Sequence, residues 1–384
     1  MKRLVFLLLS ALLFAQEVGY TRMGIYAVRE GEGSPSLYIP MLKALVKWTL
    51  EYGYKPRGPM RIEFRGVALS RKFRLMVKVN IPGIFPPRTS LSTEFVFLRP
   101  QHIAVSEPFS ASSPPSAGDF IKGLKKSGWE PSSPPFLYLR NLGELREGKL
   151  RWAVEVKRRG NFQVGIYSDR GAFHLGLIAS QRFFQTHGIT YSPLYKEDLK
   201  RKDLYSRMKL IYFPGGWSGY YTEDLKGKAA RMIRAFVEKG GRYLGVCAGA
   251  YFASREIIWE GKKYHPPLGI YPGVAVGPIT SLAPWPLYTV AEVLFEGRKL
   301  QAFYYGGPYF VGEGEVLGRY LVNEKPAVIL YRYGEGKVLL SGLHFEYELT
   351  GREDGVEFPE NEGFKTANPT WPVFEKMIKI LLEE

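Results

Sequence analysis

The sequence predicts an α/β protein of two domains. A doubly wound parallel sheet is expected over residues 161–384, after an α+β domain of two β-α-β-β repeats over residues 21–159. Two observations carry this prediction: strand-like runs alternate with helical patterns in the second half, and one strand–helix–strand–strand pattern occurs twice in the first. The length of 384 residues also exceeds what one ordinary core needs.

The repeat in the first half is marked at equivalent points of its two copies. Apolar runs end at residues 27–30 and 104–107, and a polar stretch and an amphipathic helical pattern follow each run. Gly53 and Gly128 end these patterns, because glycine leaves a helix in the left-handed conformation and a proline soon blocks its continuation. The strand-like runs that follow are 61–64 and 75–79 in one copy, and 136–139 and 152–156 in the other.

The second half begins after a basic link at residues 157–160. Its predicted strands are 162–167, 210–213 and 243–246; its predicted helices are 173–184, 228–239 and 371–382; and a late hairpin is expected over 328–341. Strands that alternate with helices favour a parallel sheet with helices on both faces. Residues 257–318 are rich in Gly, Pro and aromatic side chains, so we expect inserted strands and loops around a site there.

The composition limits the partners and cofactors. The formal net charge is +16, but the Lys and Arg residues are spread along the chain without a zinc-finger or RNA-recognition pattern. This favours a solvated basic surface over a nucleic-acid site, while peripheral association with an anionic membrane stays open. One cysteine excludes an internal disulfide framework, and five scattered histidines form no ligand pair. We therefore expect no metal and no other cofactor.

Residues 1–16 are typical of an export signal or an N-terminal anchor. Lys2 and Arg3 form a charged region, an apolar run follows, and Ala15 before Gln16 offers a cleavage point. The apolar run is short for a membrane-spanning helix. We expect a periplasmic or extracellular protein. The alternatives are an uncleaved segment that anchors the protein to the membrane and a buried first helix.

The motif that indicates chemistry is Gly245-x-Cys247-x-Gly249, which follows an apolar strand-like run. Such a turn holds the middle side chain in a strained, exposed position, and the small neighbours let strand and helix approach closely. A helix that begins near Ala248 would favour the thiolate over the thiol. The alternative is a buried apolar cysteine at a glycine-rich strand end. We interpret Cys247 as a nucleophile.

A nucleophile needs a base and a group that orients the base. His344 and Glu346 follow the last strand-like run, and side chains two residues apart share one side of an extended segment. The carboxylate of Glu346 can therefore fix the imidazole tautomer while the other ring nitrogen faces Cys247. The pair is weak evidence by itself, and its value comes from the cysteine motif in the same domain.

An oxyanion hole is the third requirement, because negative charge develops on the attacked carbonyl oxygen. Gly215 and Gly216 end a predicted strand, where open α/β sheets place their sites. Glycine lets the peptide turn its N–H toward a ligand. The N–H of Ala248 would be a second donor. The alternative is an ordinary turn at the end of the strand.

Together these segments resemble the class I glutamine amidotransferase superfamily, with its Cys–His–Glu triad on a flavodoxin-like sheet. Residues 213–216, 243–252 and 304–307 look more closely like the amidotransferase-like domain at the N-terminus of some eukaryotic biotin–protein ligases, a family that also has free-standing bacterial members. Residues 271–278 fit its middle segment. The resemblance covers about residues 161–384.

This resemblance implies a triad of Cys247, His344 and Glu346, and a substrate-binding role for Tyr251, Gly306 and Gly307. Two positions depart from true glutaminases, which usually carry Gln four residues after the nucleophile and a His-Pro-Glu motif. The first position is Tyr251 here, and the motif reads His-Phe-Glu. We therefore expect a substrate other than glutamine.

The repeat over residues 21–159 resembles gyrase-inhibitor-like effector-binding domains. Two such units pair in that family around a cleft for small, often apolar or cationic, ligands. The resemblance rests on the pattern and not on a signature motif, and it implies a ligand in this domain. The alternative is a domain that only caps or dimerises the other one.

Two functions follow from these observations. The first is an exported cysteine hydrolase or amidase that acts on a small amide or peptide-like bond. The second is a non-catalytic small-molecule-binding protein, in which Tyr251, Tyr304, Tyr305 and Tyr309 line an aromatic pocket and Cys247 only shapes it. A membrane-surface or nucleic-acid-associated role is a weaker third.

Overall fold

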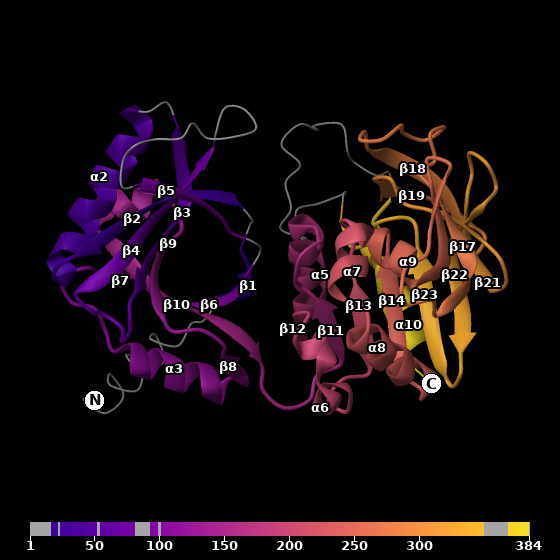
Figure 1. Ribbon diagram of the computed structural model, residues 1–384, viewed down its shortest axis with the longest axis horizontal. Coiled ribbons are helices and arrows are strands. Elements are labelled where there is room, and N and C mark those ends of the chain that lie inside the picture. Colours follow the sequence, from indigo (N-terminus) through magenta and orange to yellow (C-terminus); the bar gives the residue numbers. More distant parts are fainter. Residues whose placement is uncertain are drawn as a thin grey trace. The chain divides into compact units, whose positions relative to one another are not determined.

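The computed structural model describes residues 17–21, 24–51, 54–80, 93–98, 101–348 and 368–383. The chain divides into two compact units, Met1–Arg159 and Gly160–Glu384, and each is a mixed α/β structure (Figure 1). The signal or anchor expected over residues 1–16 lies outside the described residues. Among the helices that the structure does describe, none has the length and apolar character needed to cross a bilayer.

The first unit is built on one ten-stranded sheet, with strand order β1-β6-β10-β9-β3-β4-β2-β5 and two short strands, β7 and β8, paired with β10. Its strands are β1 (Glu17–Tyr20), β2 (Gly24–Glu32), β3 (Lys55–Phe64), β4 (Lys72–Asn80), β5 (Thr93–Leu98), β6 (His102–Val105), β7 (Phe109–Ser110), β8 (Trp129–Pro131), β9 (Phe136–Leu139) and β10 (Lys149–Arg158). Its helices are η1 (Pro35–Leu37), α2 (Tyr38–Glu51), α3 (Ala117–Lys126) and α4 (Leu142–Glu147).

The strand order of this sheet is symmetric about the pairing of β3 with β9. On one side β3 pairs with β4 and β4 with β2; on the other, β9 pairs with β10 and β10 with β6. Helix α2 follows β2 and helix α3 follows β6 in the chain. The outer strands β5 and β1 pair with β2 and β6, respectively.

Local chemistry explains the helices of this unit. Helix α2 buries an apolar stripe that includes Leu42 and Leu45, as the spacing predicts. Helix α3 begins at a Ser116 cap, whose hydroxyl accepts from the N–H of Gly118. Helix α4 was not predicted; it ends at Gly148, which has φ +67°.

The second unit is built on a nine-stranded sheet with strand order β12-β11-β13-β14-β23-β22-β21-β18-β19. Its strands are β11 (Val164–Tyr167), β12 (Tyr191–Leu194), β13 (Leu210–Phe213), β14 (Arg242–Val246), β18 (Thr289–Phe295), β19 (Arg298–Tyr304), β21 (Glu315–Tyr320), β22 (Pro326–Tyr333) and β23 (Gly336–Ser341). A second, four-stranded sheet has the order β16-β15-β17-β20, with strands β15 (Ser254–Trp259), β16 (Lys262–Tyr264), β17 (Tyr271–Gly277) and β20 (Tyr309–Val311).

The two parts of the nine-stranded sheet differ in direction. Strands β12, β11, β13, β14 and β23 are parallel, and β11, β12 and β13 are buried along their whole length. Continuous apolar burial is typical of parallel strands. Strands β22, β21, β18 and β19 continue the sheet in antiparallel pairs. The insertion predicted over residues 257–318 contains most of strands β15 to β21.

The helices of the second unit are α5 (His174–Thr186), η2 (Asp198–Lys200), α6 (Lys202–Tyr205), α7 (Ser218–Asp224), α8 (Lys228–Glu238), α9 (Ala248–Ala253) and α10 (Trp371–Leu382). The bounds predicted for the last helix, 371–382, are confirmed. Phe183 of α5 and Phe374 of α10 lie with ring centroids 4.7 Å apart, so the two helices pack together. The carboxylate of Glu348 accepts from the N–H groups of Thr370 and Trp371 and so caps α10.

Candidate thiol site

Cys247 stands at the turn between β14 and α9, with backbone φ +49° and ψ −103°. A positive φ is uncommon for a residue with a side chain and marks a strained turn. A Cβ atom at Gly245 would lie 2.6 Å from the carbonyl oxygen of Gly249, and one at Gly249 would lie 2.1 Å from that of Phe213. Neither position has room for a side chain, so the glycines of the Gly-x-Cys-x-Gly motif are explained by close backbone packing.

His344 and Glu346 form a buried pair in the segment that follows β23. The Nδ1 atom of His344 lies 2.7 Å from Oε1 of Glu346, and both side chains are buried. The N–H of His344 donates to the carbonyl oxygen of Phe303, at 2.9 Å, which fixes the segment against β19. The structure thus brings together the two residues that the sequence pairs.

The charge state of His344 follows from its surroundings. Burial alone would lower its pKa, but the Glu346 carboxylate and a hydrogen-bonding interaction with Cys247 outweigh this and raise the pKa to about 10. Nδ1 is engaged by Glu346, which leaves Nε2 for the sulfur. Nε2 has no hydrogen-bond partner within a conventional distance among the described residues. The site therefore holds a protonated imidazole near the thiol, with one N–H left for a substrate or for the sulfur.

The thiol of Cys247 is directed at a backbone carbonyl. Its Sγ atom lies 3.5 Å from the oxygen of Tyr305, and the side chain is 6% exposed. The exposed position that the sequence predicts for this side chain is therefore wrong, because Cys247 is buried. An S–H group is a weak hydrogen-bond donor. Little free energy is therefore lost if the sulfur leaves the Tyr305 carbonyl and turns to His344. Catalytic hydrogen bonds in unliganded sites are often long and tighten only when substrate binds.

Gly215 and Gly216 follow β13, at the end of the sheet where Cys247 also lies. A Cβ atom at Gly215 would lie 2.3 Å from Cε1 of His344, so this glycine makes room for the imidazole. Gly216 has φ +147° and forms an antiparallel bridge with Ala172.

The hydrogen bonds of this bridge do not use the N–H group of Gly216. The two hydrogen bonds run from Phe173 to the carbonyl of Gly215 and from Trp217 to the carbonyl of Gly171. In such a pair the N–H of the central residue, Gly216, points away from the partner strand. Ala248 is the first residue of α9, and the first N–H groups of a helix have no acceptor within it. Gly216 and Ala248 thus have backbone geometry that suits a donor, and the oxyanion-hole role expected for Gly215, Gly216 and Ala248 stays a prediction.

Four successive carbonyl groups next to the thiol accept hydrogen bonds from side chains. The Tyr305 carbonyl accepts from Cys247, and the next three accept from tyrosine hydroxyl groups. These are Tyr251 to Gly306 at 3.0 Å, Tyr304 to Gly307 at 3.0 Å and Tyr320 to Pro308 at 2.9 Å. Burial raises the pKa of all three tyrosines, so each hydroxyl stays a donor. We call residues 305–308 the clasped loop.

The clasped loop gives Tyr251 a role that the sequence does not predict. Its side chain is buried and its hydroxyl donates to the carbonyl of Gly306, so it holds the clasped loop in place. A Cβ atom at Gly277 would lie 2.0 Å from that hydroxyl, and one at Gly307 would lie 1.9 Å from the carbonyl oxygen of Gly342. The substrate-binding role expected for Tyr251, Gly306 and Gly307 stays a prediction. Tyr309, expected in an aromatic pocket, lies partly exposed on β20.

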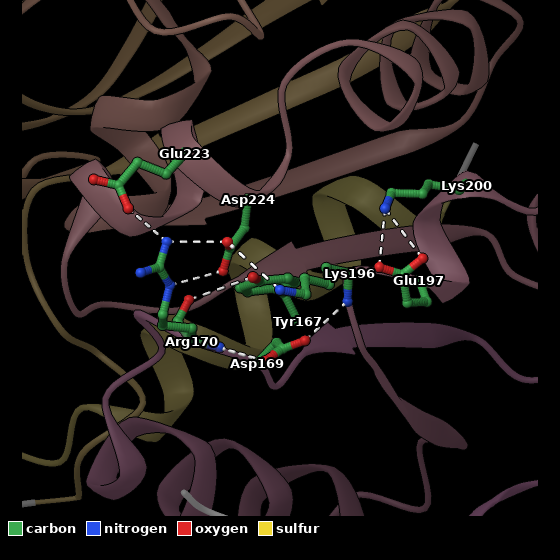
Figure 2. Close-up of polar contacts among 8 residues, drawn as sticks. All are labelled: Tyr167, Asp169, Arg170, Lys196, Glu197, Lys200, Glu223 and Asp224. Carbon is green, nitrogen blue, oxygen red and sulfur yellow. Dashed lines mark hydrogen bonds and ion pairs between the residues drawn. The ribbon is translucent and has the colours of Figure 1, made fainter.

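A charged network surrounds Arg170, the residue before Gly171, and Figure 2 shows its side chains. The guanidinium group of Arg170 donates to Asp224 at 2.9 and 3.0 Å and to Glu223, both at the end of α7. The bond to Asp224 raises the pKa of Arg170 further. Asp169 accepts from the N–H groups of Arg170 and Lys196, at 2.7 and 3.2 Å. Because Trp217 bonds to Gly171, this network also supports the backbone at Gly216.

The first unit has a second group of buried polar side chains, drawn from both copies of the predicted repeat. Arg61 of β3 is buried, donates to Gln101, and lies 3.9 Å over the ring of Phe136 on β9. Gln101 donates in turn to Glu155 of β10, and burial raises the pKa of that carboxyl. Tyr26 on β2 has its pKa raised to about 12 by burial. No sequence pattern groups these residues, because they meet only through strand pairing.

Comparison with known proteins places the second unit. Residues 160–282 match the family described as biotin-protein ligase, N terminal. The biotin–protein ligase of Schizosaccharomyces pombe is 28% identical over 222 residues, which are 48% of this chain and 33% of that one. An uncharacterized protein of Chlamydia muridarum is 31% identical over 182 residues, 41% of this chain and 65% of that one. A crystal structure of a glutamine amidotransferase aligns with 58% of this chain and 99% of its own, at 21% identity and a TM-score of 0.42.

The second unit is a mixed α/β domain. Its residues 160–282 are similar to the N-terminal domain family of biotin–protein ligases. The chain spans only a third of the length of the yeast ligase and 65% of the chlamydial protein. The matched segment includes Gly215, Gly216 and Cys247 but ends before His344 and Glu346. This similarity makes a related enzymatic or binding role the general expectation for the unit.

Proposed function

We propose that the protein is a cysteine hydrolase that cleaves a small amide or peptide-like bond at Cys247. The observation that carries the proposal is the arrangement of His344 between Glu346 and the thiol. A carboxylate on Nδ1 fixes the imidazole so that Nε2 serves the sulfur, which is the division of roles that a Cys–His–acid triad needs. The strained turn at Cys247 and the donors at Gly216 and Ala248 support the same reading.

The proposed reaction has two steps. In the first, the thiolate sulfur attacks the amide carbonyl carbon, and the N–H groups of Gly216 and Ala248 hold the oxyanion. The C–N bond then breaks, and His344 gives its Nε2 proton to the leaving amine, which leaves a thioester on Cys247. In the second step, water attacks the thioester while His344 accepts its proton. The C–S bond then breaks, the carboxylic acid leaves, and the thiolate of Cys247 and the protonated His344 are restored.

Tyr251 supports a substrate other than glutamine. It stands four residues after Cys247, and its ring and hydroxyl fill the space between Gly277 and Gly306. A side chain bound in this way cannot turn to hydrogen-bond a substrate amide without releasing the clasped loop.

The experiment that tests the hydrolase is detection of its acyl intermediate. The wild-type protein is mixed with a panel of activated amides and acyl esters, quenched in acid, and examined by intact-protein and peptide mass spectrometry. An adduct on Cys247 that decays with release of free acid is expected. Cys247→Ser is the control for non-specific acylation. The absence of a Cys247 adduct across the panel, with full recovery of both substrate and thiol, would count against the hydrolase.

A non-catalytic binding role is the second candidate, and the contact from the thiol to the Tyr305 carbonyl favours it, because the sulfur is then held by the clasped loop and not by His344. The two candidates differ in what Cys247→Ser does. A thermal-shift screen of wild type and Cys247→Ser against small apolar amides discriminates them. Equal stabilisation of both proteins without turnover supports binding, and turnover by wild type alone supports the hydrolase.

The remaining proposals concern the whole chain. Parallel pairing of β12, β11, β13, β14 and β23 supports a doubly wound sheet, and the symmetric strand order of the first unit supports a duplicated β-α-β-β unit. The buried chain from Arg61 to Glu155 is a candidate ligand site in that unit. The composition of residues 1–16 supports export or membrane anchoring, and the charge of +16 supports peripheral association with an anionic surface.

A further inference from the structure

A cluster of three tryptophans lies beside the thiol site. Trp217 follows Gly216, Trp259 ends β15, and Trp285 lies between β17 and β18. Their ring centroids are 5.4 Å (Trp259–Trp285), 6.0 Å (Trp217–Trp285) and 6.5 Å (Trp217–Trp259) apart. Trp217 is 48% exposed and the other two are partly exposed. Three segments that are distant in the sequence thus present one aromatic surface to solvent, which is a feature that a binding site explains better than packing does.

This surface is attached to the site at two points. The ring of Trp285 stacks on Tyr305, with centroids 5.0 Å apart and an interplanar angle of 22°. The carbonyl of Tyr305 is the group that accepts from the thiol of Cys247. On the other side, Trp217 is bonded in sequence to Gly216, the expected oxyanion donor. A substrate amide would contact the sulfur of Cys247 and the N–H of Gly216. The aromatic surface lies next to both contacts, because Trp285 stacks on Tyr305 and Trp217 follows Gly216.

The clasped loop also holds the tryptophans rigidly. Gly306 has φ +64°, and a Cβ atom there would lie 2.9 Å from the ring of Trp285 and 3.2 Å from that of Trp259. Tyr251 contacts Trp259 edge to face, with centroids 5.7 Å apart. Rigid aromatic side chains bury a large apolar area at little cost in conformational entropy.

We propose that Trp217, Trp259 and Trp285 form the substrate subsite for a bulky apolar group, aromatic or branched aliphatic, next to the amide that Cys247 attacks. This inference rests on the proposed hydrolase and names the substrate class of the same site. Trp259 lies edge to face with the other two rings, and Trp217 and Trp285 are tilted against each other, so at these separations no space between the rings encloses a cation. Their outer surface instead suits a flat apolar group.

The test uses chloroacetamides, in which the thiolate sulfur displaces chloride. Three probes differ only in the amide substituent: methyl, 1-naphthylmethyl and 2-(trimethylammonio)ethyl. Second-order rates of Cys247 alkylation are divided by the rates with glutathione, which removes intrinsic reactivity. We expect the naphthylmethyl probe to react at least about tenfold faster than the methyl probe, the gain typical of filling an apolar pocket.

Two variants make the assignment specific. Trp217→Ala removes the most exposed ring and should bring the naphthylmethyl-to-methyl ratio close to one. Tyr264→Ala removes a similarly exposed aromatic ring of β16 outside the cluster and should keep the ratio. Iodoacetamide, which carries no ring, gives each variant its own reference rate. Equal normalised rates of the methyl and naphthylmethyl probes in wild type, a ratio that survives in Trp217→Ala, or a preference for the cationic probe would each overturn the subsite.

A binding measurement separates this proposal from the hydrolase. N-(1-naphthylmethyl)acetamide, which cannot alkylate, is titrated into Cys247→Ser protein while tryptophan fluorescence is followed. Saturable quenching in Cys247→Ser that is lost in the double variant Cys247→Ser, Trp217→Ala supports the subsite, even where the wild-type thiol does not react. No saturable quenching by this compound, together with a reactive thiol, refutes the subsite and leaves the hydrolase standing.

Discussion

Nδ1 of His344 and Oε1 of Glu346 lie 2.7 Å apart in a pair that is almost wholly buried. The segment that holds them is not a regular strand. It is fixed by the bond from His344 to Phe303 and by the indole N–H of Trp371, which donates to the carbonyl of Glu346 at 2.8 Å. The imidazole is thus oriented before any ligand arrives, and each prediction below changes one part of this arrangement.

The protonation of His344 predicts how stability depends on pH. Folding raises its pKa from 6.5 to about 10, so the native state holds a proton that the unfolded chain releases. The stabilisation is complete below pH 6.5 and is lost as the pH rises toward 10. Urea unfolding at pH 6.5, 8 and 9.5 should therefore show wild type losing stability relative to His344→Gln. Parallel pH dependence of the two proteins would show that the imidazole is not protonated.

Gly215→Ala should displace the imidazole, because its Cβ atom would lie 2.3 Å from Cε1 of His344. We expect the ring to leave Glu346 and its NMR resonances to titrate near neutral pH, with the alkylation rate of Cys247 reduced at least about tenfold. Gly188→Ala is the control. Gly188 has φ +65° and open space around it, so alanine there adds backbone strain of about 1 kcal/mol and no clash. Unchanged His344 resonances in Gly215→Ala would contradict the packing.

Tyr251→Phe should loosen the clasped loop, because it leaves the buried carbonyl of Gly306 without its donor. Such a group costs about 1–3 kcal/mol of the free energy of unfolding. Hydrogen exchange at residues 305–308 should accelerate and the rate of Cys247 alkylation should change. Tyr205→Phe removes a hydroxyl that bonds the carbonyl of Leu199 at 2.8 Å, and should lower stability alone. If Tyr251→Phe and Tyr205→Phe change the rate of Cys247 alkylation equally, the clasped loop does not position the thiol.

Arg170→Ala should affect the site through the loop that bears Gly171. Removal of the guanidinium group frees Asp224 and Glu223 at the end of α7 (Figure 2). We expect a several-fold loss of turnover, with an unchanged global fold by circular dichroism. Loss of one oxyanion donor costs on the order of a hundredfold in rate, whereas this change only loosens the loop that holds Gly216. Arg201→Ala breaks a comparable pair with Asp203 and should leave turnover as in wild type.

The sequence predicted the elements that depend on residues close together in the chain. Its predicted final helix, strand β9 and the turn at Cys247 all reflect residues that are close in the chain, where apolar spacing and glycines carry the signal. The position of His344 beside Glu346 also follows from a separation of two residues. A resemblance then linked these pieces into one domain.

The sequence could not reveal contacts that only tertiary structure creates. The clasped loop joins tyrosines from α9, β19 and β21 to three successive carbonyls, and no spacing rule relates them. The bond from Tyr251 to the clasped loop is therefore a contact that the sequence did not predict, and its expected substrate-binding role stays a prediction. The tryptophan cluster was missed for the same reason, although Trp217 directly after two glycines was a signal that could have been followed.

The alkylation rate of Cys247 by iodoacetamide at pH 7 tests the central claim most directly. It is compared among wild type, His344→Ala and free cysteine, with the modified residue identified by mass spectrometry. A protonated imidazole held by Glu346 should make the wild-type thiol react faster than free cysteine, and His344→Ala should lower the rate at least about tenfold. A wild-type rate no greater than that of free cysteine, unchanged in His344→Ala, would show that the three residues do not act as a catalytic unit.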